Sequence, residues 1–516
     1  MIDHKHVNPW LVAVSVMFAT FMEVLDTTVV NVSLPHIAGS LSATIDEATW
    51  VLTSYLVANA IILPMTGWLA SVFGRKRLLM ASVVGFTASS FLCGLAPNLG
   101  SLIVFRILQG ATGGALQPLS QAVLLEAFPP HERGKAMGFW GQGIVVAPIL
   151  GPVLGGWLTD NYSWRWVFYI NIPVGIASIV MTKLFIFDPP YIREQTRKID
   201  YWGLGMLTVG IGALQYVLDK GQEDDWFASR TITTLTLIAA VTLTVFIVHE
   251  LTVEDPVVDL RVFKARSFAV GVFLMTIVGF VMYGSMVLLP VMLQTLLGYP
   301  SVQAGIAMAP RGAGAFFMMQ ITGQLTGRVD PRKLLTTGLV VGGVTLLWLS
   351  NLNLQAGYWD VFWPQLIQGF GMSLLFVPLT TIAMDPIPRE RMGNATSLFN
   401  LMRNLGGSIG IALTGTMLAR QQQASTAMLG ANVTPYDPAS QSMLAGLRGA
   451  FMAAGADAAT ATSRAHATLF GVVQRHAAMV AFVGIFQLMG IAFIVLVPLV
   501  LLMKRPKPRA APVDAH

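Results

Sequence analysis

Two carboxylates stand in an otherwise apolar stretch near the start of the chain, FMEVLDTTVVNVSLP at residues 21–35. Glu23 and Asp26 are three residues apart, so on a helix they share one face. A charge inside a membrane span is costly and usually faces a cavity or a partner. Desolvation away from bulk water raises the proton affinity of a carboxylate, and the like charge of a neighbouring carboxylate raises it further. Such a pair could load and release protons at cellular pH.

Arg106 is the natural counter-charge for Asp26. It lies in another apolar block, and no acid follows it at helical spacing until Glu126. Because an arginine stays ionised in proteins, a contact with Asp26 would favour the carboxylate. If this pairing formed in one conformation and broke in the other, it would couple proton binding to a conformational change. The alternative is a purely structural ion pair, with Glu23 near a wet vestibule.

The composition indicates what surrounds these residues. Of 516 residues, 54% are hydrophobic and 11% are charged, against roughly a quarter charged in soluble domains. The apolar residues form blocks that are long enough to cross a ~30 Å hydrocarbon layer as helices. The sequence predicts an all-α polytopic membrane protein with fourteen transmembrane helices. The predicted spans are 10–31, 49–71, 78–96, 102–125, 135–158, 166–187, 201–219, 230–250, 268–294, 303–326, 332–352, 361–384, 395–418 and 479–502.

The loops predict the orientation of the chain. An even number of spans places both termini on one side of the membrane. Loops on that side are basic, such as GRKR at 74–77 and GRVDPRK at 327–333, whereas PNLGS at 97–101 has no Lys or Arg. Under the positive-inside rule the basic loops and both termini are cytoplasmic. The net charge of +6 therefore reflects topology, and no basic face or arm indicates a nucleic-acid partner.

The spans form two blocks of six around an extra pair. Spans seven and eight are flanked by charged linkers. We therefore predict an N-terminal six-helix bundle at 1–187, linkers and an extra transmembrane hairpin at 188–267, and a C-terminal six-helix bundle at 268–516. The last unit includes an outer loop at 419–478, whose polar–apolar rhythm suggests amphipathic helices around the turn at 432–438. Loops of this length are usually functional.

Enzyme signatures are nearly absent. The chain has no metalloprotease, P-loop or zinc motif, and its single cysteine, Cys93, excludes an intrachain disulfide, so we expect no metal, cofactor or enzyme activity. The string GGSIG at 406–410 matches a hydrolase elbow. However, an elbow needs a strand, a turn and a helix, and this string lies in a predicted span, where small residues let helices pack closely.

Several motifs together resemble a known family. The strings RILQGATGG at 106–114 and GWLASVFGRKRLL at 67–79 are similar to two motifs of the major facilitator superfamily. Those at 25–35, 147–175 and 403–410 resemble the fourteen-span drug:proton antiporters of the EmrB/QacA type. The resemblance implies a major facilitator fold, with two six-helix bundles plus a hairpin. It also implies a proton-coupled multidrug efflux transporter that works by alternating access.

The resemblance also implies roles for individual residues. Asp26 matches the acid of the first-helix motif, and Arg106 the arginine linked to proton transfer, with Gln109 beside it, whereas Glu23 stands outside the most constant part. The expected conformational motifs are Gly67, Gly74, Arg75, Gly151, Pro152, Gly155 and Gly156. The family's loop motif usually carries an acid where this chain has Ser71, so a carboxylate-based latch at this loop is in doubt.

A substrate cavity is expected between the bundles. Its candidate residues are Glu23, Gln109, Arg311 and Arg403. Arg403 is close enough to the cytoplasmic edge that its side chain could instead extend to the interface. The 26 Met residues suit a cavity that adapts to varied guests.

The long outer loop is similar to that of EmrB-like pumps. That likeness implies a bacterial inner membrane, hydrophobic or amphiphilic drugs and protons as ligands, and a periplasmic adapter and an outer-membrane channel as partners. Two alternatives stay open. One is a proton-coupled symporter that imports a small organic solute, and the other is a membrane-embedded hydrolase using Ser408 or the Glu23–Asp26 pair.

Overall fold

The computed structural model describes residues 8–188, 200–434 and 436–504, and within these ranges it contains helices and no β-strand. The helices of the first part are α1 (Pro9–Ser40), α2 (Ile45–Phe73), α3 (Arg75–Leu95), α4 (Leu99–Gly113), α5 (Leu116–Ala127), α6 (Arg133–Asn161), α7 (Trp166–Tyr169) and α8 (Asn171–Phe185). Those of the second part are α9 (Tyr201–Lys220), α10 (Arg230–Thr252), α11 (Arg266–Thr295), α12 (Ser301–Thr326), α13 (Pro331–Leu349), α14 (Tyr358–Met384), α15 (Met392–Ala431), α16 (Pro438–Ala453), α17 (Ala458–Val495) and α18 (Val497–Val500). Short 3₁₀ turns are η1 (Trp226–Ala228), η2 (Leu260–Lys264) and η3 (Arg389–Arg391).

Twelve helical stretches in the described ranges are long and apolar enough to cross a membrane. They account for every predicted span except 303–326 and 395–418. These two segments are helical, as parts of α12 and α15, but they are not among the twelve apolar stretches. Both carry polar side chains, including Arg311 and Arg403. The number of fourteen spans therefore stays a prediction.

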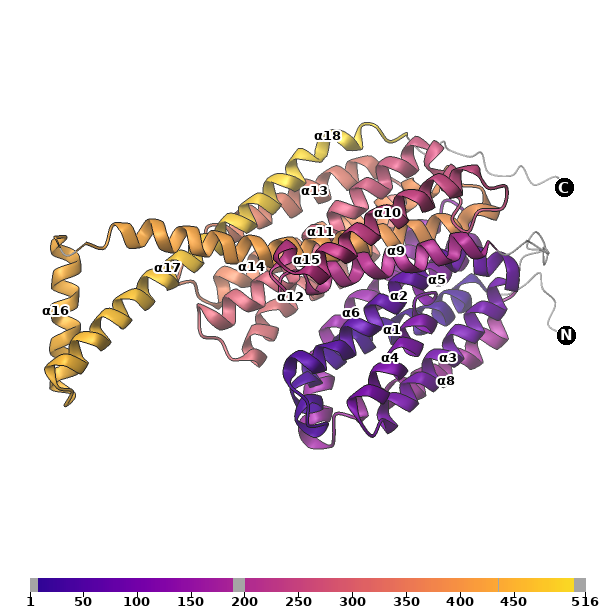
Figure 1. The fold of residues 1–516 in the computed structure, drawn as a ribbon. Helices are drawn as coiled ribbons and strands as arrows, with labels where there is room; N and C mark the ends of the chain where they lie inside the picture. The colour runs from indigo at the N-terminus through magenta and orange to yellow at the C-terminus, as the bar shows by residue number, and fades with distance from the viewer. Residues whose placement is uncertain (1–7, 189–199, 435, 505–516) are drawn as a thin grey trace, which may run out of the picture.

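The helices form two groups that lie side by side (Figure 1). In the first group, α1 packs against α6 and α8, and α4 packs between α2 and α3. In the second, α11 packs against α15, and α14 packs against α12 and α13. The helices α9 and α10 pack against each other, and α9 contacts both α2 of the first group and α15 of the second. We call these groups the first and second bundle.

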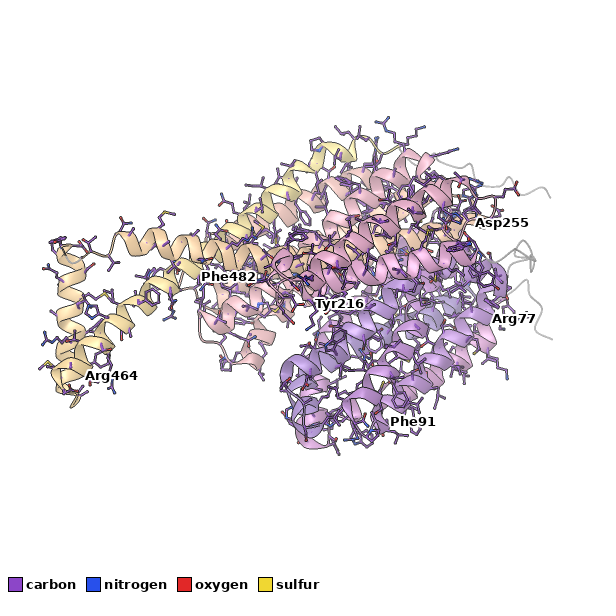
Figure 2. All side chains as sticks on the ribbon, in the orientation of Figure 1. Arg77, Phe91, Tyr216, Asp255, Arg464 and Phe482 are labelled. Carbon is purple, nitrogen blue, oxygen red and sulfur yellow. The ribbon has the colours of Figure 1, made fainter. Side chains whose placement is uncertain are left out.

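The two ends of the molecule differ in character. Figure 2 labels Arg77 and Asp255 at the end where α1 begins, and Arg464 at the opposite tip. We call the first the basic end, because the loops rich in Arg and Lys lie there, and the second the α16 end. The described chain also finishes at the basic end, after α18 (Figure 1).

The predicted outer loop is helical, as the sequence pattern suggested. The 40 residues of α15 give a length of roughly 60 Å, about twice the hydrocarbon thickness of a bilayer. The 38-residue α17 returns beside it, and α16 crosses between the two at the far tip (Figure 1). We call residues 419–478 the extension.

An aspartate caps α16 at its N-terminus. The Asp437 Oδ2 accepts hydrogen bonds from the Ser440 backbone N–H at 2.9 Å and from the Ser440 hydroxyl at 2.7 Å. These hydrogen bonds lower the pKa of the Asp437 carboxyl below its ordinary value. Because the folded pKa is depressed, the stabilisation is present at neutral pH and is lost as pH falls through that lowered pKa.

We expect Asp437→Ala to speed amide hydrogen exchange in the first turn of α16, because the Ser440 N–H loses its acceptor. The variant Asp437→Asn keeps an acceptor oxygen and serves as the control. In the parent chain, protection of this turn should stay constant from neutral pH until the pH falls below the usual titration range of aspartate. Equal exchange in the parent and Asp437→Ala would show that the cap does not hold the turn.

Candidate functional site

Asp26 of α1 and Arg106 of α4 form a buried ion pair inside the first bundle. The Arg106 Nη1 donates to Asp26 Oδ2 at 2.6 Å, and neither side chain has exposed surface. The other carboxylate oxygen accepts hydrogen bonds from Gln109 Nε2 at 3.0 Å and from Asn171 Nδ2 at 2.8 Å. Such additional hydrogen bonds help to stabilise a buried ion pair, although within the described residues none reaches Arg106 Nη2. The predicted pairing of Asp26 with Arg106 is thus present in this conformation.

Arg106 is also held by groups other than Asp26. Its Nε donates to the Val51 carbonyl at 3.0 Å, and its Nη1 donates to Gln109 Oε1 at 2.7 Å. Its guanidinium carbon lies 4.1 Å from the centre of the Tyr55 ring, in a cation–π contact. Arg106 would therefore keep several contacts if its bond to Asp26 were lost.

Glu23 lies one helical turn from Asp26 and is also buried, at 5% exposure. Asn59 Nδ2 of α2 donates to Glu23 Oε1 at 3.1 Å, and within the described residues no hydrogen bond reaches Oε2. Gln117 of α5 and Arg403 of α15 are close enough to act on this carboxylate. Glu23 thus has fewer donors than Asp26 and lies nearer to the second bundle.

Side chains close to Glu23 join the two bundles. Arg403 donates to the Gln117 side chain, which belongs to the first bundle. One turn away, Asn400 Nδ2 donates to Gln121 Oε1 at 2.6 Å. Arg403 is 5% exposed, so its guanidinium is engaged at the contact between the bundles and does not extend to the membrane surface.

Glycines allow a close approach of the bundles towards the basic end. A Cβ on Gly67 of α2 would lie 2.5 Å from the Asn394 Cα of α15, and one on Gly134 of α6 would lie 2.7 Å from the Gly323 carbonyl oxygen of α12. Real Cβ atoms essentially never come this close to other heavy atoms. The backbones themselves are therefore in contact, and the bundles are closed at this end.

The loop motif between α2 and α3 has a carboxylate partner that its own sequence lacks. Gly74 has φ +82°, a conformation that L side chains rarely adopt, and it joins α2 directly to α3. Arg75 forms an ion pair with Glu126 at the end of α5, and its Nη2 donates to the Arg389 carbonyl of the second bundle at 3.4 Å. Among the described residues, the Ser71 hydroxyl donates only to the Trp68 carbonyl of its own helix. Glu126 thus supplies the carboxylate that Ser71 does not.

The remaining motif residues lie elsewhere. Gly151 and Gly155 of α6 pack against Thr28 and Val29 of α1, within the first bundle. Pro152 is exposed. A Cβ on Gly156 would lie 3.9 Å from Val32 Cγ1, an ordinary van der Waals contact. Arg311 of α12 donates to Ser285 Oγ at 3.3 Å, and in the described ranges it has no carboxylate partner.

The GGSIG string lies in the middle of α15 and does not form an elbow. Gly406 and Gly410 pack against the carbonyl groups of Thr276 and Phe280 in α11. The Ser408 hydroxyl exchanges hydrogen bonds with the Gln215 amide of α9 at 3.0 and 3.2 Å. These glycines serve close helix packing, and Ser408 links α15 to the hairpin.

Sequence reasoning missed four residues of the site. They are Asn59, Gln117, Glu126 and Asn171. Asn171 lies in the quoted motif 147–175, and Gln117 follows the motif 106–114 by three residues. Their polar character inside predicted spans was the signal that could have identified them.

A comparison with known families decides the class of the chain. The family model described as Major Facilitator Superfamily matches residues 16–411 of this chain. The chain belongs to the major facilitator superfamily. It is accordingly a multi-pass membrane transporter, with the all-helical fold of that superfamily.

Two curated relatives within the superfamily cover most of the chain. The multidrug export protein EmrB of Escherichia coli (strain K12) is 41% identical over 440 residues, 85% of this chain and 86% of that protein. The fatty acid resistance protein FarB of Neisseria gonorrhoeae is 41% identical over 502 residues, 96% of each chain. Among solved structures, the human organic anion transporter MFSD10 (TETRAN) has a TM-score of 0.61 at 11% identity, covering 95% of this chain and 100% of that one, which shows the shared fold.

We expect Gly67→Val to open the major facilitator bundles at the basic end. A side chain at 2.5 Å from Asn394 would have to withdraw by roughly 1 Å to reach an ordinary carbon–carbon contact. Spin labels at positions 77 and 333, in a Cys93→Ser background, should report longer distances than in the parent. Gly205→Val is the control, because nothing lies within 4 Å of a Cβ there. An unchanged distance distribution in Gly67→Val would contradict closure through this contact.

Proposed function

We propose that the chain is a proton-coupled multidrug exporter that works by alternating access between its two bundles. The observation that carries this proposal is the fully buried Asp26–Arg106 pair, one helical turn from Glu23. The names of the two relatives, a multidrug export protein and a fatty acid resistance protein, favour hydrophobic or amphiphilic compounds as substrates. Export of such compounds against a gradient requires an energy source, and titrating carboxylates can supply it from protons.

The proposed coupling rests on charge. When Asp26 is ionised, it and Arg106 neutralise each other. Protonation of Asp26 would leave Arg106 as an uncompensated buried cation, and breaking a buried pair costs ~3–5 kcal/mol. Protonation of Glu23 would remove the negative charge that faces Arg403 across the Gln117 contact. We propose that the loss of both charges disfavours the closed basic end, directly for Glu23 and through the shared helix α1 for Asp26, so proton binding would promote opening at that end.

The orientation follows from the loops. With the basic end in the cytoplasm, as the positive-inside rule expects, the described conformation is closed to the cytoplasm and the extension projects outward. We propose that the chain lies in a bacterial inner membrane, with the extension in the periplasm. There we propose that it contacts a periplasmic adapter, which joins the pump to an outer-membrane channel.

Fourteen spans fit this arrangement. The polar faces of α12 and α15 are directed at other helices, as the contacts of Arg403, Asn400 and Gln320 show within the described residues. A helix whose polar groups face protein can cross a membrane with less apolar sequence. The division into bundles at 1–187 and 268–516 with a hairpin between them is part of the same proposal. We further propose Glu23, Arg311 and Arg403 as cavity residues, whereas Gln109 is engaged by Asp26.

The energy of one proton sets the expected size of the effect. A proton that falls through ~100 mV releases ~2.3 kcal/mol, and each pH unit adds ~1.4 kcal/mol. The sum would sustain a gradient of a neutral substrate of roughly several hundredfold. Loss of the coupling carboxylate should abolish that gradient while leaving the fold intact.

Proteoliposomes that carry the purified chain and a panel of fluorescent hydrophobic dyes test the proposal. An imposed proton gradient should drive dye movement opposite to the protons in the parent. Asp26→Asn keeps the size of the side chain and should not concentrate dye, and Glu23→Gln should have a milder effect. Dye movement in the same direction as the protons would indicate the import alternative. Consumption of a substrate without dye transport would indicate the hydrolase.

Replacement of residues 419–478 by a short Gly/Ser linker tests the role of the extension. We expect the bundles to fold and to transport dye in proteoliposomes, because the extension lies beyond them (Figure 1). Drug resistance in cells and co-purification of the adapter should be lost. If the shortened chain kept full resistance and still bound the adapter, the extension would not be the docking element.

A further inference from the structure

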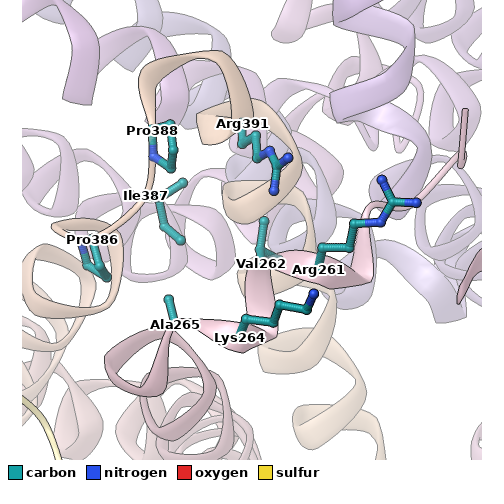
Figure 3. Close-up of a pocket in the computed structure, with 8 residues that line it drawn as sticks. All are labelled: Arg261, Val262, Lys264, Ala265, Pro386, Ile387, Pro388 and Arg391. Carbon is teal, nitrogen blue, oxygen red and sulfur yellow. The ribbon is translucent and has the colours of Figure 1, made fainter. Parts of the chain in front are cut away.

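A pocket of about 320 Å³ opens at the basic end, between two segments that are far apart in sequence. One wall is the linker before α11, and the other is the loop between α14 and α15. The lining residues are Arg261, Val262, Lys264, Ala265, Pro386, Ile387, Pro388 and Arg391. Figure 3 shows Arg261 and Lys264 on the linker, and Arg391 together with residues 386–388 on the loop between α14 and α15. The lining thus combines three positive charges with five apolar residues and contains no acid.

Two cations of this pocket, Lys264 and Arg391, have donor groups that can bind an anion. Within the described part of the chain, no hydrogen bond or ion pair engages Lys264 Nζ. Arg391 Nε lies 3.5 Å from Asp259 Oδ2, which is longer than a charge-assisted hydrogen bond. Arg391 is 47% exposed in its side chain, so its guanidinium is open to a ligand.

The position of the pocket indicates which anion it would meet. It lies where α11 and α15, two helices of the second bundle, begin. Basic pockets between transmembrane helices at such a boundary suit phospholipid head groups. The prolines and Ile387 add an apolar surface beside the charges, which free phosphate would not use. We propose that this pocket binds the phosphate of an anionic phospholipid through Lys264 and Arg391.

The site would act on the contact between the bundles. Asp259, which precedes η2, bonds with Asn394 of α15: its N–H donates to Asn394 Oδ1 at 3.2 Å, and its carbonyl accepts from Asn394 Nδ2 at 2.8 Å. The same Asn394 backbone contacts Gly67 of the first bundle. A phosphate that bridges Lys264 and Arg391 ties the linker to the start of α15 and thereby favours the closed basic end.

Native mass spectrometry of the full chain in detergent tests the site, with phosphatidylglycerol as the probe and phosphatidylcholine as the neutral lipid. Each cation near a phosphate contributes about 1 kcal/mol, so Lys264→Gln/Arg391→Gln should bind phosphatidylglycerol roughly thirtyfold more weakly. The matched control is Arg328→Gln/Lys333→Gln, which removes two exposed cations at the same end outside the pocket. It should bind like the parent.

Four outcomes would overturn the proposal. Equal weakening in the pocket and control variants would mean a diffuse charge effect. Unchanged binding in the pocket variant would mean that the lipid binds elsewhere. Binding of inorganic phosphate alone, with the same dependence on Lys264 and Arg391 and with displacement of the lipid, would assign the pocket to a free anion. If the double variant does not fold, each single variant should still weaken binding roughly fivefold, and no weakening in either would refute the site.

Discussion

The arrangement of the first bundle depends on the free-energy cost of burying a charge in a low-dielectric interior. Asp26 and Arg106 lie without exposed surface, and each is tolerated there because the other is present. Removal of one partner of such a pair costs ~3–5 kcal/mol. A proton moving down a typical gradient releases energy of the same order. Under the proposed mechanism, a single protonation of Asp26 would be large enough to change which conformation is stable.

The second requirement is a contact between bundles that can open. Inside a membrane, apolar packing gives little preference for one arrangement over another, since lipid tails are as apolar as the helices. The bundles meet through glycines, as at Gly67 and Gly134, through amide and guanidinium contacts, and through apolar side chains such as the stacked rings of Trp140 and Phe376. Glu23 lies close to Gln117 and Arg403, so the second carboxylate of the proposed mechanism is beside the contact between the bundles.

The sequence was sufficient for the helices and for the central ion pair, because hydropathy marks spans and a charge inside a span requires a partner. It was insufficient where partners come from distant segments. Asn171 and Gln117 are ordinary polar residues in sequence, and only the packing of α8 and of α5 against α1 brings them to the carboxylates Asp26 and Glu23. Glu126 shows the same limit: the missing acid at Ser71 left the latch in doubt, yet a carboxylate 51 residues beyond Arg75 lies beside it. Hydropathy also failed to settle α12 and α15, since helices that face protein can carry more polar residues.

The central claim is that Asp26 exchanges its proton as substrate binds. The most direct measurement is dye-induced proton release from the purified chain in weakly buffered detergent solution, followed with a pH indicator as pH is varied, with a dye that the parent exports. The parent should release protons when dye is added, and Asp26→Asn should release fewer over the same pH range. If Asp26→Asn released as many protons as the parent, Asp26 would be a structural partner of Arg106 and the coupling site would lie elsewhere.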